Sequence, residues 1–367
     1  MPPFTLPEFC PPDFSKPPLV EAPLVTFKTV EKPGVAPEGF HVTSIYPEYF
    51  HLAEGQWLLP GESRMDCVVV LEQDGTLSVK EFRRLEPGDR VACGRQENGE
   101  EGIYLHAAAF GLECHVSEKF AFRTQVCRET SFSFDYDELY EILEHERDKG
   151  FILWVLGPAV AFDKDAREAL TGIINEGFTH GLLAGNALAV HDLEASLFGT
   201  ALGQDIYTKR HAHLSHYKHI DTINRIREIG SIEEAVDSGV IKDGIIHAIV
   251  KKTIPYVLAG SIRDDGPLPG VIADAYEAQD RMRALARKAT TVIAMATQLH
   301  SIATGNMIPS YRLMDDGSIR PVYFFTIDMS EFAVNKLANR GSLTARSILT
   351  NTQDFIVNLH RKLRRKG

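Results

Sequence analysis

Arg263, Asp264 and Asp265 stand side by side in a loop rich in glycine and proline, and together they could bind and act on a small charged molecule. A guanidinium binds a carboxylate through two parallel hydrogen bonds, and a neighbouring carboxylate can hold an ammonium group or accept a proton. This charge pattern suits a substrate with one carboxylate and more than one ammonium group. The alternative is that the three side chains only form ion pairs within the loop.

Asn186, His191 and Asp192 are polar side chains in an otherwise apolar stretch, residues 181–199. Its first residues predict a buried strand, Gly185 and Asn186 break the apolar run, and regularly spaced leucines then predict a helix. At the carboxyl end of a strand in a parallel sheet, the free N–H groups of such a helix attract anions. The stretch is therefore a candidate ligand site. The alternative is that Asn186 caps the helix while His191 and Asp192 face water.

Four histidines, at positions 211, 213, 216 and 219, raise the question of a metal site. No nearby cysteine or carboxylate completes a tetrahedral set of ligands, so we predict no metal and favour a solvated or intersubunit surface. Cys114 and His115 could pair as nucleophile and base, but adjacent residues on a strand point to opposite faces, so a catalytic pair is not favoured. The five cysteines contain no CxxC pair, which is typical of free thiols in a reducing cytoplasm.

The candidate residues of both stretches follow predicted strands of a single sheet. After residue 150 apolar runs alternate with helical segments, and strands are predicted at residues 151–156, 178–184, 254–259, 291–296 and 322–327. The alternation predicts an α/β fold with a doubly wound parallel sheet covered on both faces by helices. A nucleotide site in such a sheet requires strand ends that converge on one rim, and Asp328 at the last end could bind ribose hydroxyls. No GxGxxG motif is present, so motifs alone leave dinucleotide binding open.

The sequence before this α/β part predicts two further parts. Residues 1–37 hold ten of the nineteen prolines, so we expect an extended arm with neither a regular helix nor a central strand. Its apolar side chains could pack on a neighbouring subunit and make the protein a homo-oligomer. Residues 38–130 predict a small β-rich domain, with turn sequences between strands expected at 65–71, 76–82 and 90–93. The NAD-binding α/β domain then covers residues 131–367.

Composition argues against several classes of protein. The chain has 367 residues, a net charge of -11 and an isoelectric point near 5.7, which disfavours nucleic acid or an anionic membrane as a partner. No basic region precedes an apolar core at the N-terminus, and no run of about eighteen apolar residues occurs, so neither a secretory signal nor a membrane span is predicted. We therefore expect a cytoplasmic protein that acts on a small molecule.

Four longer motifs, residues 183–194, 257–269, 299–309 and 328–342, closely resemble the NAD-dependent, archaeal-type ornithine cyclodeaminase family. The same module, often described as a lysine-ketoglutarate reductase/saccharopine dehydrogenase-like region, forms the C-terminal part of bifunctional arginine dihydrolases. The resemblance runs from about residue 37 to about residue 359. It implies a Rossmann-like fold similar to deoxyhypusine synthase, with NAD held at the strand ends. The residues that it places at the cofactor are Gly185, Asn186, Ala187, Gly260, Ser261, His300, Ser301, Gly305, Asn306 and Asp328.

The resemblance also implies a reaction. NAD would accept a hydride from Cα of an amino acid, a distal amine would attack the resulting imine, ammonia would leave, and the cyclic imine would take the hydride back. Arg263 would hold the α-carboxylate of the substrate. The candidates for acid–base work and for holding the distal ammonium are Asp264, Asp265, His191 and Asp192. Ornithine fits such a site, as do lysine and related diamino acids.

One departure from the family keeps other functions open. Where the family tends to have histidine, threonine and two glycines after the first strand, residues 159–163 of this chain read Ala-Val-Ala-Phe-Asp. The protein could therefore be a binding module that senses NAD or an amino acid without turnover. It could also be an NAD-dependent amino-acid dehydrogenase, or a transferase similar to deoxyhypusine synthase. The transferase needs a lysine among the strand-end motifs, and none occurs in them before Lys336.

Overall fold

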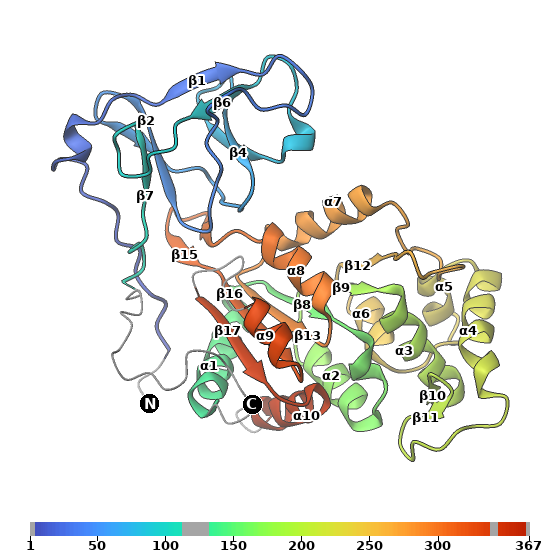
Figure 1. Ribbon diagram of the computed structural model, residues 1–367. Coiled ribbons are helices and arrows are strands. Elements are labelled where there is room, and N and C mark those ends of the chain that lie inside the picture. Colours follow the sequence, from blue (N-terminus) through green and yellow to red (C-terminus); the bar gives the residue numbers. More distant parts are fainter. Residues whose placement is uncertain (1–3, 112–131, 338–343, 365–367) are drawn as a thin grey trace.

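The structure is a computed structural model that describes residues 4–111, 132–337 and 344–364. A β-rich region from the first part of the chain stands beside a larger α/β region (Figure 1). Cys114, His115 and the end of the fourth motif, residues 338–342, lie outside the described residues. Within the described residues, no helix combines the length and the apolar character needed to cross a membrane.

Two small antiparallel sheets form the β-rich region. In the first, β1 (Thr26–Thr29), β6 (Arg90–Cys93), β4 (Val68–Leu71) and β5 (Leu77–Lys80) pair in that order; in the second, β3 (Gln56–Leu58), β2 (Glu48–Ala53) and β7 (Ile103–Leu105) do. The turn between β4 and β5 contains Gly75 at a φ of 84°, a left-handed conformation that glycine adopts without steric cost. The three strands predicted between residues 65 and 93 are confirmed; β4 and β5 are shorter than predicted, and β6 has the predicted bounds.

The proline-rich segment packs against its own chain. Phe9 meets the ring of Phe110 edge-on, and Phe14 stacks on Trp57 with 4.9 Å between the ring centroids. Residues 26–29, which we expected in the extended arm, form the edge strand β1, in keeping with the exclusion of prolines from central strands. Phe9 and Phe14 therefore have partners within the chain, whereas Val20 and Leu24 are exposed, and packing of this segment on a neighbouring subunit stays a prediction.

The α/β region is built on a six-stranded sheet in which every pair of neighbouring strands is parallel. Numbered along the chain from its first strand, the spatial order is 3-2-1-4-5-6, the doubly wound order in which dinucleotides bind. The five predicted strands are all present, and a sixth, β17, was missed. In spatial order the strands are β12 (Tyr256–Ala259), β9 (Gly181–Gly185), β8 (Ile152–Leu156), β13 (Thr291–Met295), β16 (Tyr323–Asp328) and β17 (Thr344–Leu349).

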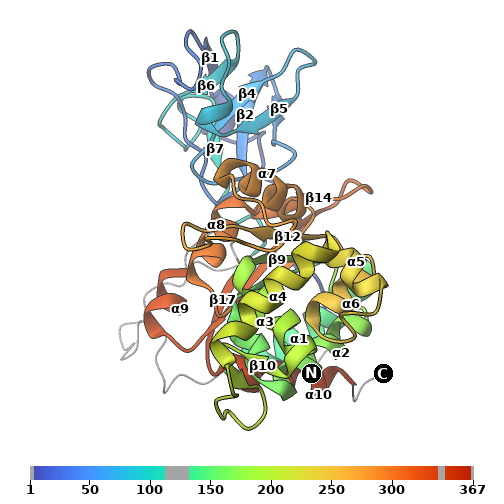
Figure 2. The ribbon, with the colours of Figure 1, turned by 90° about the vertical axis from the view of Figure 1, so that its right-hand side faces the viewer.

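Helices cover both faces of this sheet, as predicted, and the alternation along β8 shows why (Figures 1 and 2). Ile152, Trp154 and Leu156 are buried against one layer of helices, and Leu153 and Val155 against the other. The first layer includes α1 (Ser133–Lys149), α2 (Lys164–Asn175), α3 (Asn186–Phe198), α6 (Ile245–Lys251) and α10 (Thr352–Arg364), and the second includes α7 (Ala275–Ala286) and α8 (Gln298–Met307).

Three helices and two short hairpins complete the α/β region. α9 (Glu331–Leu337) lies against β16 and β17, and α4 (Ser215–Ile229) packs on α3 and on α5 (Ile232–Asp237). One hairpin, β14 (Tyr311–Leu313) with β15 (Ile319–Pro321), reaches the β-rich region, where the Tyr311 hydroxyl donates to the carbonyl of Pro60 at 2.6 Å. The other hairpin, β10 (Thr200–Ala201) with β11 (Gln204–Asp205), projects beyond α3.

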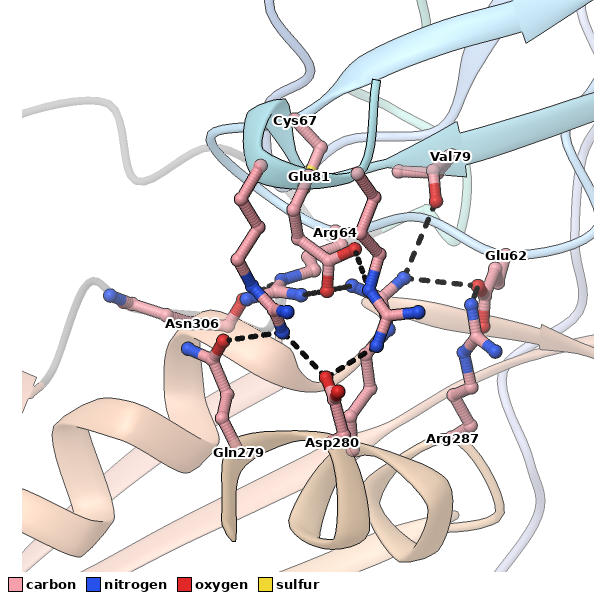
Figure 3. A network of polar contacts seen from close by, with 12 residues as sticks. Glu62, Arg64, Cys67, Val79, Glu81, Gln279, Asp280, Arg287 and Asn306 are labelled. Carbon is pink, nitrogen blue, oxygen red and sulfur yellow. Dashed lines mark hydrogen bonds and ion pairs between the residues drawn. The ribbon is translucent and has the colours of Figure 1, made fainter. Parts of the chain in front are cut away.

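Arginine–carboxylate contacts bind the β-rich region to α7 and α8 (Figure 3). Arg283 on α7 donates from Nη1 to Glu81 Oε1 at 2.7 Å and from Nη2 to Glu62 Oε1 at 3.2 Å. Arg64 forms an ion pair with the same Glu81, and its Nε donates to the backbone carbonyl of Asn306 near the end of α8 at 3.2 Å. The last turn of α8 is thereby held against the β-rich region, while its first turn lies at the carboxyl edge of the sheet.

Candidate active site

The carboxyl ends of β8, β9, β12 and β13 meet around a cavity of about 150 Å³. The cavity lies where the strand order reverses, between β8 and β13, which is the position at which open α/β sheets bind ligands. Larger cavities of about 540 Å³ and 910 Å³ lie beside Tyr256 at the edge of the sheet and beneath the proline-rich segment. None of the predicted site residues lines those two cavities, or the two of about 410 and 380 Å³ beside Arg283 and Tyr311, so the cavity of about 150 Å³ is the candidate site.

Two helices begin at this cavity with no side-chain cap on their first N–H groups. α3 starts after Gly185, and α8 starts after Thr297, whose hydroxyl makes no capping hydrogen bond. Free N–H groups and the positive end of the helix dipole bind anions such as phosphate. Glycine at position 185 lets the His300 ring lie close to the start of α3, because a Cβ atom there would lie 3.0 Å from Cε1 of His300. At Gly157 a Cβ would lie 1.9 Å from the carbonyl oxygen of Ala296, so the two central strands end this close together only because that residue is glycine.

Asn186 and Asp264 lie 78 residues apart in sequence and meet at the wall of the cavity. The Asn186 amide donates to Asp264 Oδ1 at 3.4 Å, and Asn186 Oδ1 accepts from the N–H of Leu268 at 3.1 Å. Asp264 Oδ2 accepts from the N–H of Ser261 at 2.9 Å. Both side chains therefore hold the loop after β12 against the start of α3. Asn186 does not cap α3, because Gly185 occupies the N-cap position.

Arg263 lines the cavity, and within the described part of the chain its guanidinium has no hydrogen-bond or ion-pair partner. Asp265 is exposed and lies outside the cavity wall. The ion pairs within the loop that were the alternative for these residues are therefore not formed. Arg263 is the only lysine or arginine among the described residues that line the cavity, so a negatively charged group of a ligand would meet it there.

His300 lies in the first turn of α8 and lines the cavity beside Gly185. Within the described residues, neither ring nitrogen of His300 has a hydrogen-bond partner. Burial of the ring lowers the pKa of His300 from its usual value of 6.5, because a buried imidazolium loses its hydration. The ring is therefore neutral at pH 7, with one nitrogen able to accept a proton.

His191 and Asp192 are buried in the packing of α3 and lie outside the cavity wall. His191 Nδ1 is 3.0 Å from Oε2 of the fully buried Glu194. Asp192 is also fully buried, and it accepts hydrogen bonds from Arg167 Nε at 2.6 Å and from the N–H groups of Ile245 and Ile246 at 3.0 and 2.8 Å. The alternative that both side chains face water is wrong. The structure does not bring either of them together with Arg263 and Asp264.

Arg167, which the sequence analysis did not identify, is the partner that explains the burial of Asp192. Burial disfavours the Arg167 charge, but the carboxylates of Asp192 and Asp243 favour it more strongly and raise the pKa of the guanidinium. The pair joins α2 to α3, and Asp192 also holds the start of α6. These contacts explain why Asp192 is buried, and they give it a structural role in joining α2, α3 and α6.

The residues predicted to contact the cofactor fall into two groups. Gly185, Asn186, Ala187, Ser261 and His300 line the cavity, and Gly260 lies directly beside it, with its N–H bonded to the carbonyl of Ile272 at 2.8 Å. The second group lies outside the cavity wall. Its members are Ser301, which is buried, Gly305 and Asn306 toward the far end of α8, and Asp328, whose Oδ1 accepts from the N–H of Ser330 at 2.9 Å.

Cavity residues missed by the sequence analysis include Gly157, Pro158, Thr297 and Leu299. They follow β8 and β13, the two central strands. The rule that ligands bind at the reversal of strand order would have identified them if the order had been predicted. Among the four clustered histidines, His211, His213 and His216 are exposed, and no group of three or more His, Cys, Asp or Glu side chains in the described ranges could hold a metal ion.

The family model described as the C-terminal Rossmann fold of ArgZ-like arginine dihydrolases matches residues 137–359. The ornithine cyclodeaminase of Methanopyrus kandleri is 38% identical over 342 residues, which are 90% of this chain and 76% of that protein.

Two solved structures are similar over nearly the whole chain. A conserved putative LOR/SDH protein from Methanococcus maripaludis has a TM-score of 0.84 and 33% identity over 94% of this chain and 99% of its own. The ternary complex of AgrE with ornithine and NAD+ has a TM-score of 0.58 and 30% identity over 94% of this chain, but the match covers only 46% of AgrE. By sequence and by structure, this chain belongs to the archaeal-type ornithine cyclodeaminase family, whose Rossmann module is also the C-terminal module of ArgZ-like arginine dihydrolases.

Proposed function

We propose that this protein is an NAD-dependent cyclodeaminase that converts ornithine, or a closely related diamino acid, to a cyclic imino acid and ammonia. The observation that carries the proposal is the cavity at the switch point of the sheet. It is lined by Arg263, which has no ion-pair partner among the described residues, by the carboxylate of Asp264 and by the neutral ring of His300. The relatives named ornithine cyclodeaminase support the substrate class. The AgrE complex supports the pairing of ornithine with NAD.

The starts of two helices at the cavity suit one part of NAD, its pyrophosphate group. The uncapped starts of α3 and α8 offer N–H groups to the pyrophosphate. Asn186 and Asp264 keep the loop after β12 in place against the start of α3. When bound, NAD supplies the reversible hydride acceptor for Cα of the substrate.

Arg263 and Asp264 suit the two ends of a diamino acid. The Arg263 guanidinium binds the α-carboxylate through two hydrogen bonds, since it has no competing partner among the described residues. Asp264 attracts the distal ammonium group and orients its nitrogen for ring closure, while Asp265 at the outer side of the loop adds to the negative charge. A substrate without the second amine would lack both this contact and the nucleophile.

Turnover with ornithine tests the proposal directly. Protein incubated with NAD and ornithine should release ammonia and form the cyclic product without net accumulation of NADH, and lysine and shorter diamino acids should define the chain-length preference. Stoichiometric NADH with a keto acid would establish an amino-acid dehydrogenase instead. Saturable ornithine binding without ammonia would establish a sensor. No lysine is found among the described residues that line the cavity, which disfavours the transferase similar to deoxyhypusine synthase.

We further propose that the protein is a homo-oligomer. Large apolar side chains are exposed on the hairpin β10–β11, the segment after it and the first part of α4: Leu202, Tyr207, Leu214, Tyr217 and Ile220. Large apolar side chains grouped on one surface are typical of a protein–protein contact. Light scattering coupled to size exclusion should give a multiple of the 40.9 kDa chain mass, and Leu214→Asp should reduce it. A monomer at micromolar concentration would contradict this proposal.

A further inference from the structure

The proposed reaction needs a group that removes a proton from the α-ammonium of the substrate, because only a neutral amine can release a hydride from its carbon. Asp264 and Asp265, the two carboxylates beside Arg263 in the loop after β12, are poorly placed to accept this proton. Asp264 already accepts hydrogen bonds on both oxygens, from Ser261 and from Asn186, and Asp265 lies outside the cavity wall. A carboxylate that holds a loop in place loses those contacts when it is protonated.

The two acid–base candidates on α3 are committed to protein partners. Asp192 accepts three hydrogen bonds in a fully buried position, and His191 is held at Nδ1 by Glu194. Neither side chain lines the cavity. Protonation of Asp192 would leave the buried guanidinium of Arg167 with Asp243 as its counter-ion.

His300 has the properties that these groups lack. Its ring lines the cavity, has no hydrogen-bond partner among the described residues and is neutral at pH 7. The charged side chains that line the same cavity are Arg263 and Asp264, both from the loop after β12. The loop after β8 and the first turn of α3 contribute no titratable side chain to the lining. The positive start of α8 further favours a neutral imidazole over an imidazolium.

We propose that His300 is the proton acceptor of the reaction, and thus a catalytic residue instead of a contact to the cofactor. An N–H bond of the α-ammonium breaks, the proton moves to the free ring nitrogen of His300, and the electron pair remains on the amine. The C–H electron pair of Cα then leaves as the hydride that NAD takes up and later returns. The distal ammonium then gives one proton to the α-nitrogen as its own nitrogen bonds to Cα, and the bond from Cα to the α-nitrogen breaks. The imidazolium gives its proton to the departing ammonia, which leaves as ammonium, so the ring ends neutral. This inference rests on the proposed cyclodeaminase function.

The first arm of the test measures turnover in His300→Gln, with His247→Gln on α6 as the matched control, since His247 is half-buried and lies outside the cavity. At saturating NAD and ornithine, His300→Gln should lower kcat by about 100-fold or more, as expected for the loss of a general base. Its Kd for NAD should stay within about threefold of the parent value, and added imidazole should restore part of the rate. The control should keep kcat and the urea-unfolding midpoint. A raised Kd for NAD with an unchanged kcat would make His300 a cofactor contact and overturn the proposal.

The second arm does not depend on turnover. Ornithine binding to the protein–NADH complex, which cannot accept a hydride, is measured by calorimetry between pH 5 and pH 8. Protonated His300 repels the α-ammonium, so the Kd of the parent protein should rise as the pH falls below the pKa of His300, and the Kd of His300→Gln should not. If the parent protein binds ornithine in this way but releases no ammonia, the cyclodeaminase proposal fails while His300 remains the group that faces the ammonium. A Kd with the same pH dependence in both proteins, or no binding in either, overturns the inference.

Discussion

Replacing Asp192 by alanine should damage folding much more than chemistry. The carboxylate is fully buried and accepts hydrogen bonds from Arg167 Nε at 2.6 Å and from two N–H groups at the start of α6 at 3.0 and 2.8 Å. A hydrogen bond to a charged group contributes about 1.5–3 kcal/mol, and removing one partner of a buried ion pair costs about 3–5 kcal/mol. Since the remaining guanidinium keeps Asp243 as a partner, we expect Asp192→Ala to lower the free energy of unfolding by about 4 kcal/mol.

Urea unfolding measures this loss. With a slope of about 3 kcal/mol per molar urea, the midpoint should fall by roughly 1.3 M. Asp243→Asn is the matched control, because it removes the other carboxylate from the same guanidinium at a side chain that is 62% exposed, and it should cost about 0–1 kcal/mol. Ammonia release per folded molecule should stay within about threefold in both variants, well short of the losses typical of a missing acid or base. An unchanged midpoint with a 100-fold loss of turnover in Asp192→Ala would refute this reasoning and restore Asp192 to the catalytic residues.

Further outcomes follow from the cavity. Gly185→Ala should lower kcat by about 10-fold or more, because its Cβ would lie 3.0 Å from Cε1 of His300 and the ring would have to shift, whereas Gly61→Ala, with nothing within 4 Å, should keep kcat in the same ammonia assay. Arg263→Lys should raise the KM for ornithine by about 10-fold with little change in kcat, since lysine cannot form the two-fold contact to a carboxylate. Because burial lowers the pKa of His300 in the folded protein, kcat/KM should stay level from pH 8 to pH 6.5 and fall only at lower pH. The same histidine has a higher pKa in the unfolded chain, which therefore binds the proton first. His300 should thus lower the free energy of unfolding as the pH falls below 6.5. Ornithine deuterated at Cα should give a cyclic product that retains the label, which mass spectrometry detects.

The sequence predicted most of the α/β fold because its central strands are buried on both faces. β8 and β13 have no partly exposed residue, so β8 appears as an unbroken apolar run and β13 as an apolar run after Thr291. β17 was missed because it lies at the edge of the sheet and is largely half-buried, so Arg346 and Ser347 interrupt its apolar pattern. Strand order could not be predicted from these runs either, since it depends on which strands pair across long stretches of chain.

Prediction of the site was less complete for a similar reason. Asn186, Arg263, Asp264 and His300 were identified as site residues, and all four line one cavity. The role of each depends on partners that the sequence does not reveal: Asn186 is tied to Leu268, 82 residues away, and Asp192 to a buried arginine on another helix. A motif can contain residues that hold the site together as well as residues that contact a ligand, and nothing in their spacing separates the two kinds.

In the structure, residues that hold the site together differ from residues that can contact a ligand in one respect: their polar atoms already have hydrogen-bond partners. A ligand gains little from a group such as Asp192, whose hydrogen bonds to protein must first be broken, because each buried group left without a partner costs about 1–3 kcal/mol. Arg263 and His300 have no side-chain partners among the described residues and share one cavity, so a ligand needs to displace only water from them. Arg283 and Glu81 are also charged and line a cavity, but their charges already neutralise each other. For the same reason they are assigned to the contact between the β-rich region and α7, and not to a second binding site.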